Sequence, residues 1–186
     1  DVYKRQIQTP LLFCAYLLPI PWCFIVIYGL IRFFTSYIKT KDISIGLEKN
    51  YFIPWTEKGN SLLRSIHYPP VDANTNMHRA RAHEDINLIT LLIGAEEGGL
   101  EVLNKDGSWI EVAPSSDAIV CNIGDMMQLV TDKKLKSTTH RVIQDKKTTS
   151  KSRYSIPFFL HPAPSVILKS VYRKDDQGII ADEFLD

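Results

Sequence analysis

The stretch RARAHEDINLITLL, residues 79–92, joins a charged segment directly to an apolar run rich in β-branched residues. His83 and Asp85 stand two positions apart where the charged segment ends. Side chains two apart on a strand point to the same face of a sheet. These two side chains can therefore contact one bound object together, and the question becomes where a third ligand would come from.

Working outward, short apolar or alternating runs are separated by turn signals along most of the chain. Asp106-Gly107 is a hairpin signal, and Pro69-Pro70 ends a strand. Residues 71–82 are polar and are predicted to form a loop. The predicted strands are residues 61–68, 86–94, 100–104, 109–113, 118–124, 137–143 and 153–161. Short strands at roughly even spacing predict a mainly β fold, an antiparallel sandwich or jelly roll.

Composition indicates an ordinary globular protein. The chain has 186 residues, of which 45% are hydrophobic and 23% charged, which suits one domain with a real core. A net charge of +1 gives no sign of a nucleic-acid surface. Cys14, Cys23 and Cys121 form no CxxC or zinc pattern, and their odd number argues against a disulfide framework. We therefore expect a reducing, cytoplasmic location.

The N-terminal part differs from the rest. DVYKRQ, residues 1–6, resembles the translation of a transposase adapter used in sequencing libraries, so we expect a library scar there. Residues 7–41 are an apolar segment, without a charged residue between Arg5 and Arg32. Three interpretations remain open: a membrane anchor through residues 10–31, which would form an apolar N-terminal helix, a signal-type segment, or non-native sequence. Contact with a membrane is expected only if residues 10–31 are native.

A candidate third ligand is His140, in the stretch KSTTHRV. Two histidines and one carboxylate leave coordination positions open, as in non-haem Fe(II) enzymes, whereas structural zinc favours a closed tetrahedral set. Arg153 and Ser155 follow, again two apart on a predicted strand. The guanidinium fork of arginine matches a carboxylate, and a buried arginine needs an anionic partner. A dicarboxylate co-substrate would supply that anion.

The ordered set HxD, distal H and RxS resembles the iron(II)/2-oxoglutarate-dependent oxygenases, and most closely their isopenicillin N synthase-like branch. The resemblance covers about residues 43–186, within an oxygenase domain predicted over residues 42–186. It is carried by LLRSIHYPP, AHEDINLITLL, GGLEVLNKDGSWIEV, IVCNIGDMMQLVT, KSTTHRV and RYSIPFFLHP. It implies a double-stranded β-helix, or jelly roll, with iron at its open end. It further implies iron ligation by His83, Asp85 and His140, binding of 2-oxoglutarate by Arg153 and Ser155, and a place near the co-substrate for Tyr68 of HYPP.

The same resemblance implies an activity. 2-Oxoglutarate would be decarboxylated to succinate while dioxygen and Fe(II) serve the oxidation of a small molecule, with ascorbate as a further reductant. One alternative is an iron oxidase of the same fold, in which Arg153 and Ser155 bind the substrate's own carboxylate. Another is an inactive fragment, because the family's N-terminal region and C-terminal closing helix have no full counterpart here. We therefore expect a chain truncated at both ends.

Several neighbouring residues have structural interpretations. Arg141 should face away from His140 and form a structural ion pair. His67 is expected to line the pocket, whereas His78 should lie in a loop. Asp125, after Gly124, indicates turn chemistry rather than catalysis.

Overall fold

The computed structural model describes residues 45–48, 50–72, 78–93, 98–112, 118–144 and 150–185. The predictions for residues 1–6 and 7–41, including the apolar N-terminal helix, lie outside the described residues. Within the described ranges, none of the helices has the length and apolar character needed to cross a membrane.

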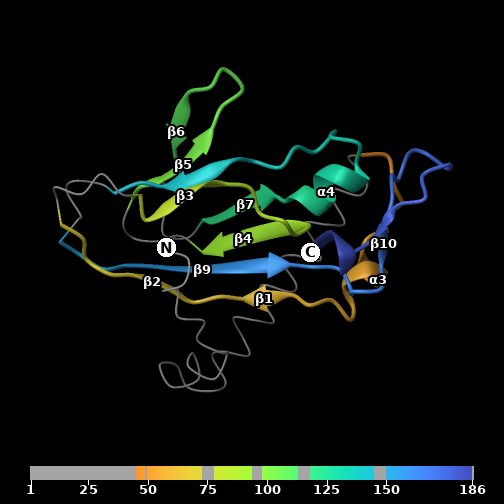
Figure 1. The fold of residues 1–186 in the computed structure, drawn as a ribbon, viewed down its shortest axis with the longest axis horizontal. Coiled ribbons are helices and arrows are strands. Elements are labelled where there is room, and N and C mark those ends of the chain that lie inside the picture. Colours follow the sequence, from red (N-terminus) through yellow and green to blue (C-terminus); the bar gives the residue numbers. More distant parts are fainter. Residues whose placement is uncertain are drawn as a thin grey trace.

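Two antiparallel sheets face each other and enclose the interior of the protein (Figure 1). The larger sheet has the order β1-β9-β4-β7, and β2 also pairs with β9. The smaller sheet has the order β3-β8-β5-β6, and its β5–β6 hairpin projects from the body. The mainly β, jelly-roll prediction is thus confirmed. The larger sheet consists of β1 (Leu62–Leu63), β2 (Ile66–Tyr68), β4 (Ile89–Ile93), β7 (Ile119–Ile123) and β9 (Arg153–Leu160). The smaller consists of β3 (Ala80–His83), β5 (Leu100–Leu103), β6 (Trp109–Glu111) and β8 (His140–Val142).

The outer face of the larger sheet carries the hydrophobic core. Ile89 and Leu91 of β4 point to this face and pack with Met126 and Met127 of α4 (Asp125–Val130). The alternate residues of β4, Thr90 and Leu92, point the other way into a cavity between the sheets. The period of two in a strand therefore separates a packed face from a functional face.

The C-terminal segment completes this outer layer. It contains the hairpin of β10 (Ile167–Leu168) and β11 (Ile179–Ile180), and the 3₁₀ helix Glu183–Leu185. α3 (Ile53–Thr56) adds Trp55 to the same cluster, and the neighbouring Phe52 is only 1% exposed. The outer face of the larger sheet is thus covered by segments from both ends of the described chain.

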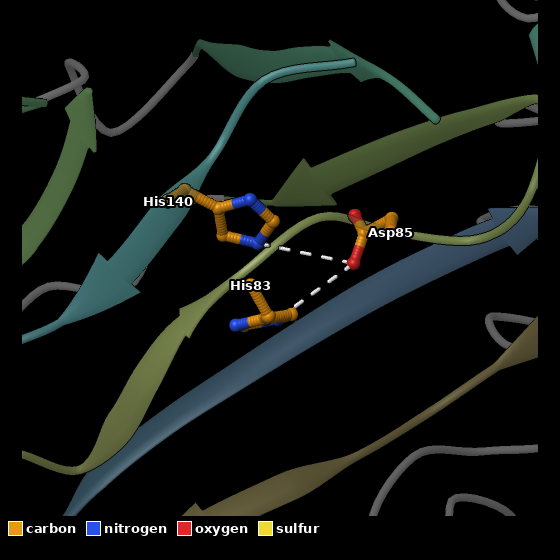
Figure 2. Close-up of side chains that lie close together, drawn as sticks. All are labelled: His83, Asp85 and His140. Carbon is orange, nitrogen blue, oxygen red and sulfur yellow. Dashed lines mark ion pairs between the residues drawn. The ribbon is translucent and has the colours of Figure 1, made fainter. Parts of the chain in front are cut away.

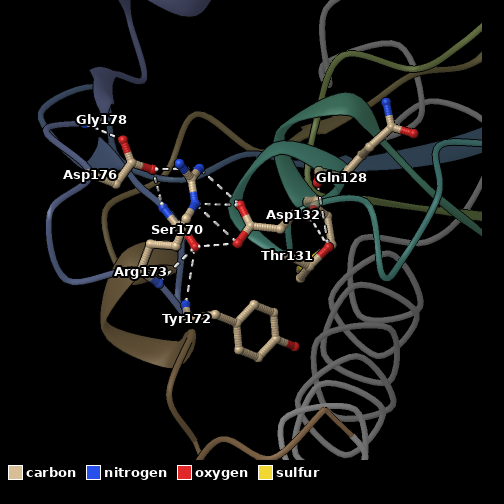
Figure 3. Close-up of polar contacts among 9 residues, drawn as sticks. Gln128, Thr131, Asp132, Ser170, Tyr172, Arg173, Asp176 and Gly178 are labelled. Carbon is tan, nitrogen blue, oxygen red and sulfur yellow. Dashed lines mark hydrogen bonds and ion pairs between the residues drawn. The ribbon is translucent and has the colours of Figure 1, made fainter.

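Figure 3 shows how the loop after β10 is attached to the end of α4. The Asp132 carboxylate accepts hydrogen bonds from Ser170 Oγ at 2.7 Å and from Arg173 Nη2 at 3.0 Å. The hydrogen bond from Arg173, followed by that from Ser170, holds the pKa of Asp132 below its usual 3.8. Asp176 accepts from the backbone N–H groups of Ser170 and Gly178, which lower its pKa as well.

Two of the elements near the candidate site differ from the sequence predictions. The loop predicted over residues 71–82 was wrong at its end, because β3 begins at Ala80. Its residues Ala-Arg-Ala-His carry no apolar stripe, since their inward positions face a cavity rather than a packed core. The turn expected at Asp125 opens into α4, whose start is fixed by backbone bonds from Asp125 to Asp85 and from Met126 to Ile86. Hydrogen bonds between distant segments produce no local sequence pattern from which the start of this helix could be predicted.

Candidate metal centre

Strand pairing brings the two candidate histidines together. His83 ends β3 and lies directly opposite His140, the first residue of β8. Directly paired residues of antiparallel strands present their side chains on the same face. The two imidazole rings accordingly lie 4.4 Å apart between centroids.

Asp85 lies just past the end of β3, in the bend that leads to β4. The sequence argument placed it on a strand with His83, which was wrong, yet its carboxylate still faces both histidines (Figure 2). Its Oδ1 atom lies 3.8 Å from Nε2 of His83 and 3.8 Å from Nε2 of His140. The backbone carbonyl of Asp85 accepts a hydrogen bond from Asp125, which holds the bend in place.

Both imidazoles are oriented by the backbone. Nδ1 of His83 lies 2.7 Å from the carbonyl oxygen of Arg81, and Nδ1 of His140 lies 3.0 Å from that of Thr138. A carbonyl only accepts hydrogen bonds, so in the neutral form of each ring Nδ1 carries the proton and Nε2 has the lone pair that a metal would use. Backbone contacts of this kind fix the tautomer and ring orientation that metal ligation requires.

The other carboxylate oxygen of Asp85 is held by the protein. Oδ2 accepts hydrogen bonds from Thr90 Oγ1 at 2.6 Å and from Asn122 Nδ2 at 2.8 Å. Asn87, which is fully buried, in turn donates to Thr90 Oγ1 at 2.9 Å. With Oδ2 engaged, Oδ1 is the oxygen left to face the two Nε2 atoms.

These three side chains have the composition and spacing of a metal site. Within the described residues they are the one group of three or more His, Cys, Asp or Glu side chains whose donor atoms all lie within 4.8 Å of one another. Two bonds of about 2.1 Å to one ion separate their donor atoms by at most about 4.2 Å, which accommodates the 3.8 Å distances. Two imidazoles and one carboxylate with open positions suit Fe(II).

A cavity of about 90 Å³ leads from these three side chains into the space between the sheets. Its walls are mostly apolar side chains from both sheets, with Arg153 and Ser155 of β9 among them. Thr90, which bonds Asp85, is paired with Phe159 on β9. Ser155 lies four residues from Phe159, or about 13 Å along the strand. The triad and the Arg153 side of the cavity are therefore at opposite ends.

Arg153, Ser155 and Tyr68 form that far end. Their exposed fractions are 3%, 6% and 9%, so all three are buried. Tyr68 on β2 is the direct cross-strand partner of Arg153, and the guanidinium carbon lies 5.4 Å from the centroid of the tyrosine ring. Nε of Arg153 donates a long hydrogen bond of 3.4 Å to the carbonyl of Gly98. The structure thus gathers the three residues expected to bind a co-substrate in one place.

The remaining expectations had mixed outcomes. The structural pair predicted for Arg141 is confirmed, because its Nε donates to Glu101 at 2.7 Å, outside the cavity. The pocket-lining position expected for His67 was wrong, because its ring is exposed and bonds Ser152. His161 is half-buried after β9, and burial holds its pKa below 6.5 against the opposing effects of the Phe159 carbonyl and Asp85.

Thr90 and Asn122 are site residues that sequence reasoning missed. Each is a polar residue inside an otherwise apolar strand, and the two are cross-strand partners on β4 and β7. Along each strand, both residues occupy positions whose side chains point toward the cavity. A single polar residue at such a position in an apolar strand was the sequence signal that could have identified them.

Comparison with protein families places these features in a known context. The family model described as "2OG-Fe(II) oxygenase superfamily" matches residues 59–162. The "2-oxoglutarate-Fe(II) type oxidoreductase hxnY" of Emericella nidulans is 38% identical over 131 residues, covering 68% of this chain and 37% of that protein. A gibberellin 2-beta-dioxygenase of Phaseolus coccineus is 37% identical over 125 residues, covering 61% of this chain and 37% of that protein.

Solved structures with the same fold agree with this match. A 2OG-Fe(II) oxygenase family protein from Caulobacter crescentus superposes with a TM-score of 0.79 at 38% identity, covering 95% of this chain and 59% of that one. A full-length protein of Neurospora crassa, solved in complex with alpha-KG, superposes with a TM-score of 0.70 at 28% identity, covering 86% and 56%. The chain thus spans between 37% and 59% of the length of these relatives, which is less than two thirds.

Proposed function

Because the chain belongs to the 2OG-Fe(II) oxygenase superfamily, we propose that it is an Fe(II)-dependent oxygenase that couples 2-oxoglutarate decarboxylation to the oxidation of a small molecule. The observation that carries this proposal is the arrangement around Asp85. Its Oδ1 faces two Nε2 atoms at 3.8 Å, while its Oδ2 is held by other side chains. The oxygenase domain that we propose covers residues 42–186 and includes the family match.

In this proposal, His83, Asp85 and His140 hold Fe(II) through Nε2, Oδ1 and Nε2. The bound iron supplies the redox chemistry with dioxygen that protein side chains lack. The chain's own contribution is to orient three donors through fixed hydrogen bonds and to leave the cavity side open. The mostly apolar walls exclude water from the reacting groups.

Arg153 and Ser155 bind the distal carboxylate of 2-oxoglutarate in this proposal. Their burial at the far end of the cavity supports it, because a guanidinium and a hydroxyl side by side offer a carboxylate several charge-assisted donors. Tyr68 packs beside the guanidinium and limits its movement. The dicarboxylate would then extend from Arg153 toward the metal ligands.

Three further points are part of the proposal. Dioxygen and a small molecule are the reaction partners, and ascorbate keeps the metal reduced between turnovers. The location is a reducing one, the cytoplasm, in keeping with a sequence whose cysteines form no disulfide framework. An iron oxidase that does not use 2-oxoglutarate is less favoured, because the relatives are named 2-oxoglutarate-dependent enzymes.

The proposal is tested with the purified chain under anaerobic conditions. Addition of Fe(II) and 2-oxoglutarate should produce the visible charge-transfer absorption of an iron-bound keto acid. His140→Ala should abolish the band, and Arg153→Gln should raise the 2-oxoglutarate concentration needed for it. Arg141→Gln is the matched control, because it removes a guanidinium outside the cavity and should leave the band unchanged.

Two results would contradict the proposal. Iron binding without a band at any 2-oxoglutarate concentration would favour the oxidase alternative. A folded chain that binds no iron would reject the metal centre itself. After a substrate is found, formation of one succinate per oxidised product would establish the coupling.

A further inference from the structure

Arg64 lies on the cavity-facing side of the larger sheet. Leu62 pairs with Phe159, and Ile66 pairs with Ser155, so the register on β9 is the same on both sides of Arg64. The backbone N–H of Arg64 donates to the carbonyl of Pro157 at 3.0 Å, as this register requires. Ile66, Ser155 and Phe159 line the cavity, and Arg64 shares their parity.

The guanidinium of Arg64 has no anionic partner in the described part of the chain. Its Nε is buried there without a hydrogen bond, and no ion pair involves this side chain. Its contact is with the ring of Phe159, whose centroid lies 5.5 Å from the guanidinium carbon. A buried donor without a hydrogen bond is costly, so the half-buried guanidinium would gain from an anion that is not part of the chain.

Arg64 is separated both from the metal ligands and from Arg153. Arg64 lies opposite Pro157 on β9. Pro157 is four residues from Arg153 on the same strand, which corresponds to a separation of about 13 Å. Thr90, which donates a hydrogen bond to Asp85, lies on β4, and β9 runs between β4 and Arg64. Two strand spacings, about 10 Å, therefore separate Thr90 from Arg64. A dicarboxylate held by Arg153 near the metal therefore leaves the guanidinium of Arg64 available.

We propose that Arg64 binds a carboxylate of the primary substrate and selects small apolar carboxylic acids. This inference rests on the proposed function and adds its substrate class. The carbon body of such an acid would pack on Phe159 and Pro157, which lie between Arg64 and the metal ligands on the cavity wall. The carboxylate would be anchored at Arg64, and a carbon several bonds away would face the metal centre.

The test uses the chain loaded with Mn(II) and 2-oxoglutarate, so that binding is measured without turnover. The probes are 3-phenylpropionate and cyclohexylacetate, each compared with its primary amide by isothermal titration calorimetry. A charged hydrogen-bonded pair should make each acid bind about 10-fold more tightly than its amide. Arg64→Gln should remove this preference, and Arg64→Lys should keep part of it, because an ammonium retains the charge without the fork. Lys58→Gln, which removes an exposed positive charge, should leave it unchanged.

The outcomes separate this inference from the proposed function. Equal or undetectable binding of acids and amides, with the keto-acid band intact, would overturn the role of Arg64 alone. An acid preference that survives in Arg64→Gln would do the same. Loss of the band in Arg64→Gln would mean that Arg64 holds the co-substrate, which also overturns the inference. A wild-type chain with no band would instead reject the proposed function.

Discussion

Replacing Thr90 with valine tests whether the orientation of Asp85 sets metal affinity. The change keeps the shape of a side chain that is 3% exposed and removes the hydroxyl that donates to Asp85 Oδ2 at 2.6 Å. A hydrogen bond to a charged group contributes about 1.5–3 kcal/mol. Asn122 still donates to the same oxygen at 2.8 Å, so the carboxylate keeps one of its two supports.

Only part of this hydrogen-bond energy changes the free energy of metal binding. Without metal, the released Oδ2 can take up water, because the cavity opens beside it, and this recovers some of the lost interaction. With metal bound, Oδ1 must stay directed at the ion while Oδ2 lacks one donor. We therefore expect a loss of about 1.4 kcal/mol in binding, which is a 10-fold higher Kd, at the lower end of the range known for residues that support metal ligands.

The assay is anaerobic titration of Fe(II), or of Mn(II) as a redox-inert substitute, followed by calorimetry. Thr131→Val is the matched control, because Thr131 is fully buried and its hydroxyl donates at 2.7 Å to the carbonyl of Met127 within α4, away from the metal ligands. It should lower the free energy of unfolding and leave the metal Kd unchanged. A Thr90→Val chain that is folded and binds metal with wild-type affinity would refute the reasoning.

Three further predictions concern metal loading, packing and acid. In wild type, Mn(II) at 100 times its Kd should stabilise the fold by about 2.7 kcal/mol, and His140→Ala should lose most of this gain, measured as the metal-induced shift in Tm. Gly124→Ala should lower the free energy of unfolding by at least about 2 kcal/mol in urea denaturation, because its Cβ would lie 2.1 Å from the backbone oxygen of Asn87; unchanged stability would contradict this packing. Because the folded pKa of Asp132 is depressed, its stabilising contribution is complete above pH 3.8 and is lost as the pH falls through the folded value. Arg173→Gln should therefore flatten the loss of stability below pH 4, and an unchanged acid profile would show that the pair is not responsible.

The sequence predicted the strands whose side chains have a packed face on one side. β4, β7 and β9 all fall inside predicted runs, because their core-facing positions are regularly apolar. It failed for β3, whose inward positions face a cavity and need no apolar residue. It also failed for α4, because a six-residue helix has too little pattern of its own and is fixed by backbone bonds to the bend at Asp85.

The same distinction applies to the site. The motif spacing predicted a metal site at His83, Asp85 and His140, and the structure brings these three side chains together. The supporting residues had no such signal, because Thr90 and Asn122 acquire their role only when β4 and β7 pair. Residues that hold a ligand in place are determined by register, and register is not visible in a single strand.

Strand register also explains why the sequence alone did not predict a role for Arg64. One arginine in a run of apolar residues usually faces solvent, and an edge strand such as β1 would permit that. The shared register of β1 and β2 on β9 instead places Arg64 on the cavity-facing side, because Leu63 and His67 occupy the opposite parity. Arg153 lies on the cavity wall, and Arg64 lies half-buried on the same face of the larger sheet, beside Phe159. In our proposal, a substrate that extends past Phe159 meets the guanidinium of Arg64 at its outer end, and a carboxylate there offsets the cost of desolvating this cation.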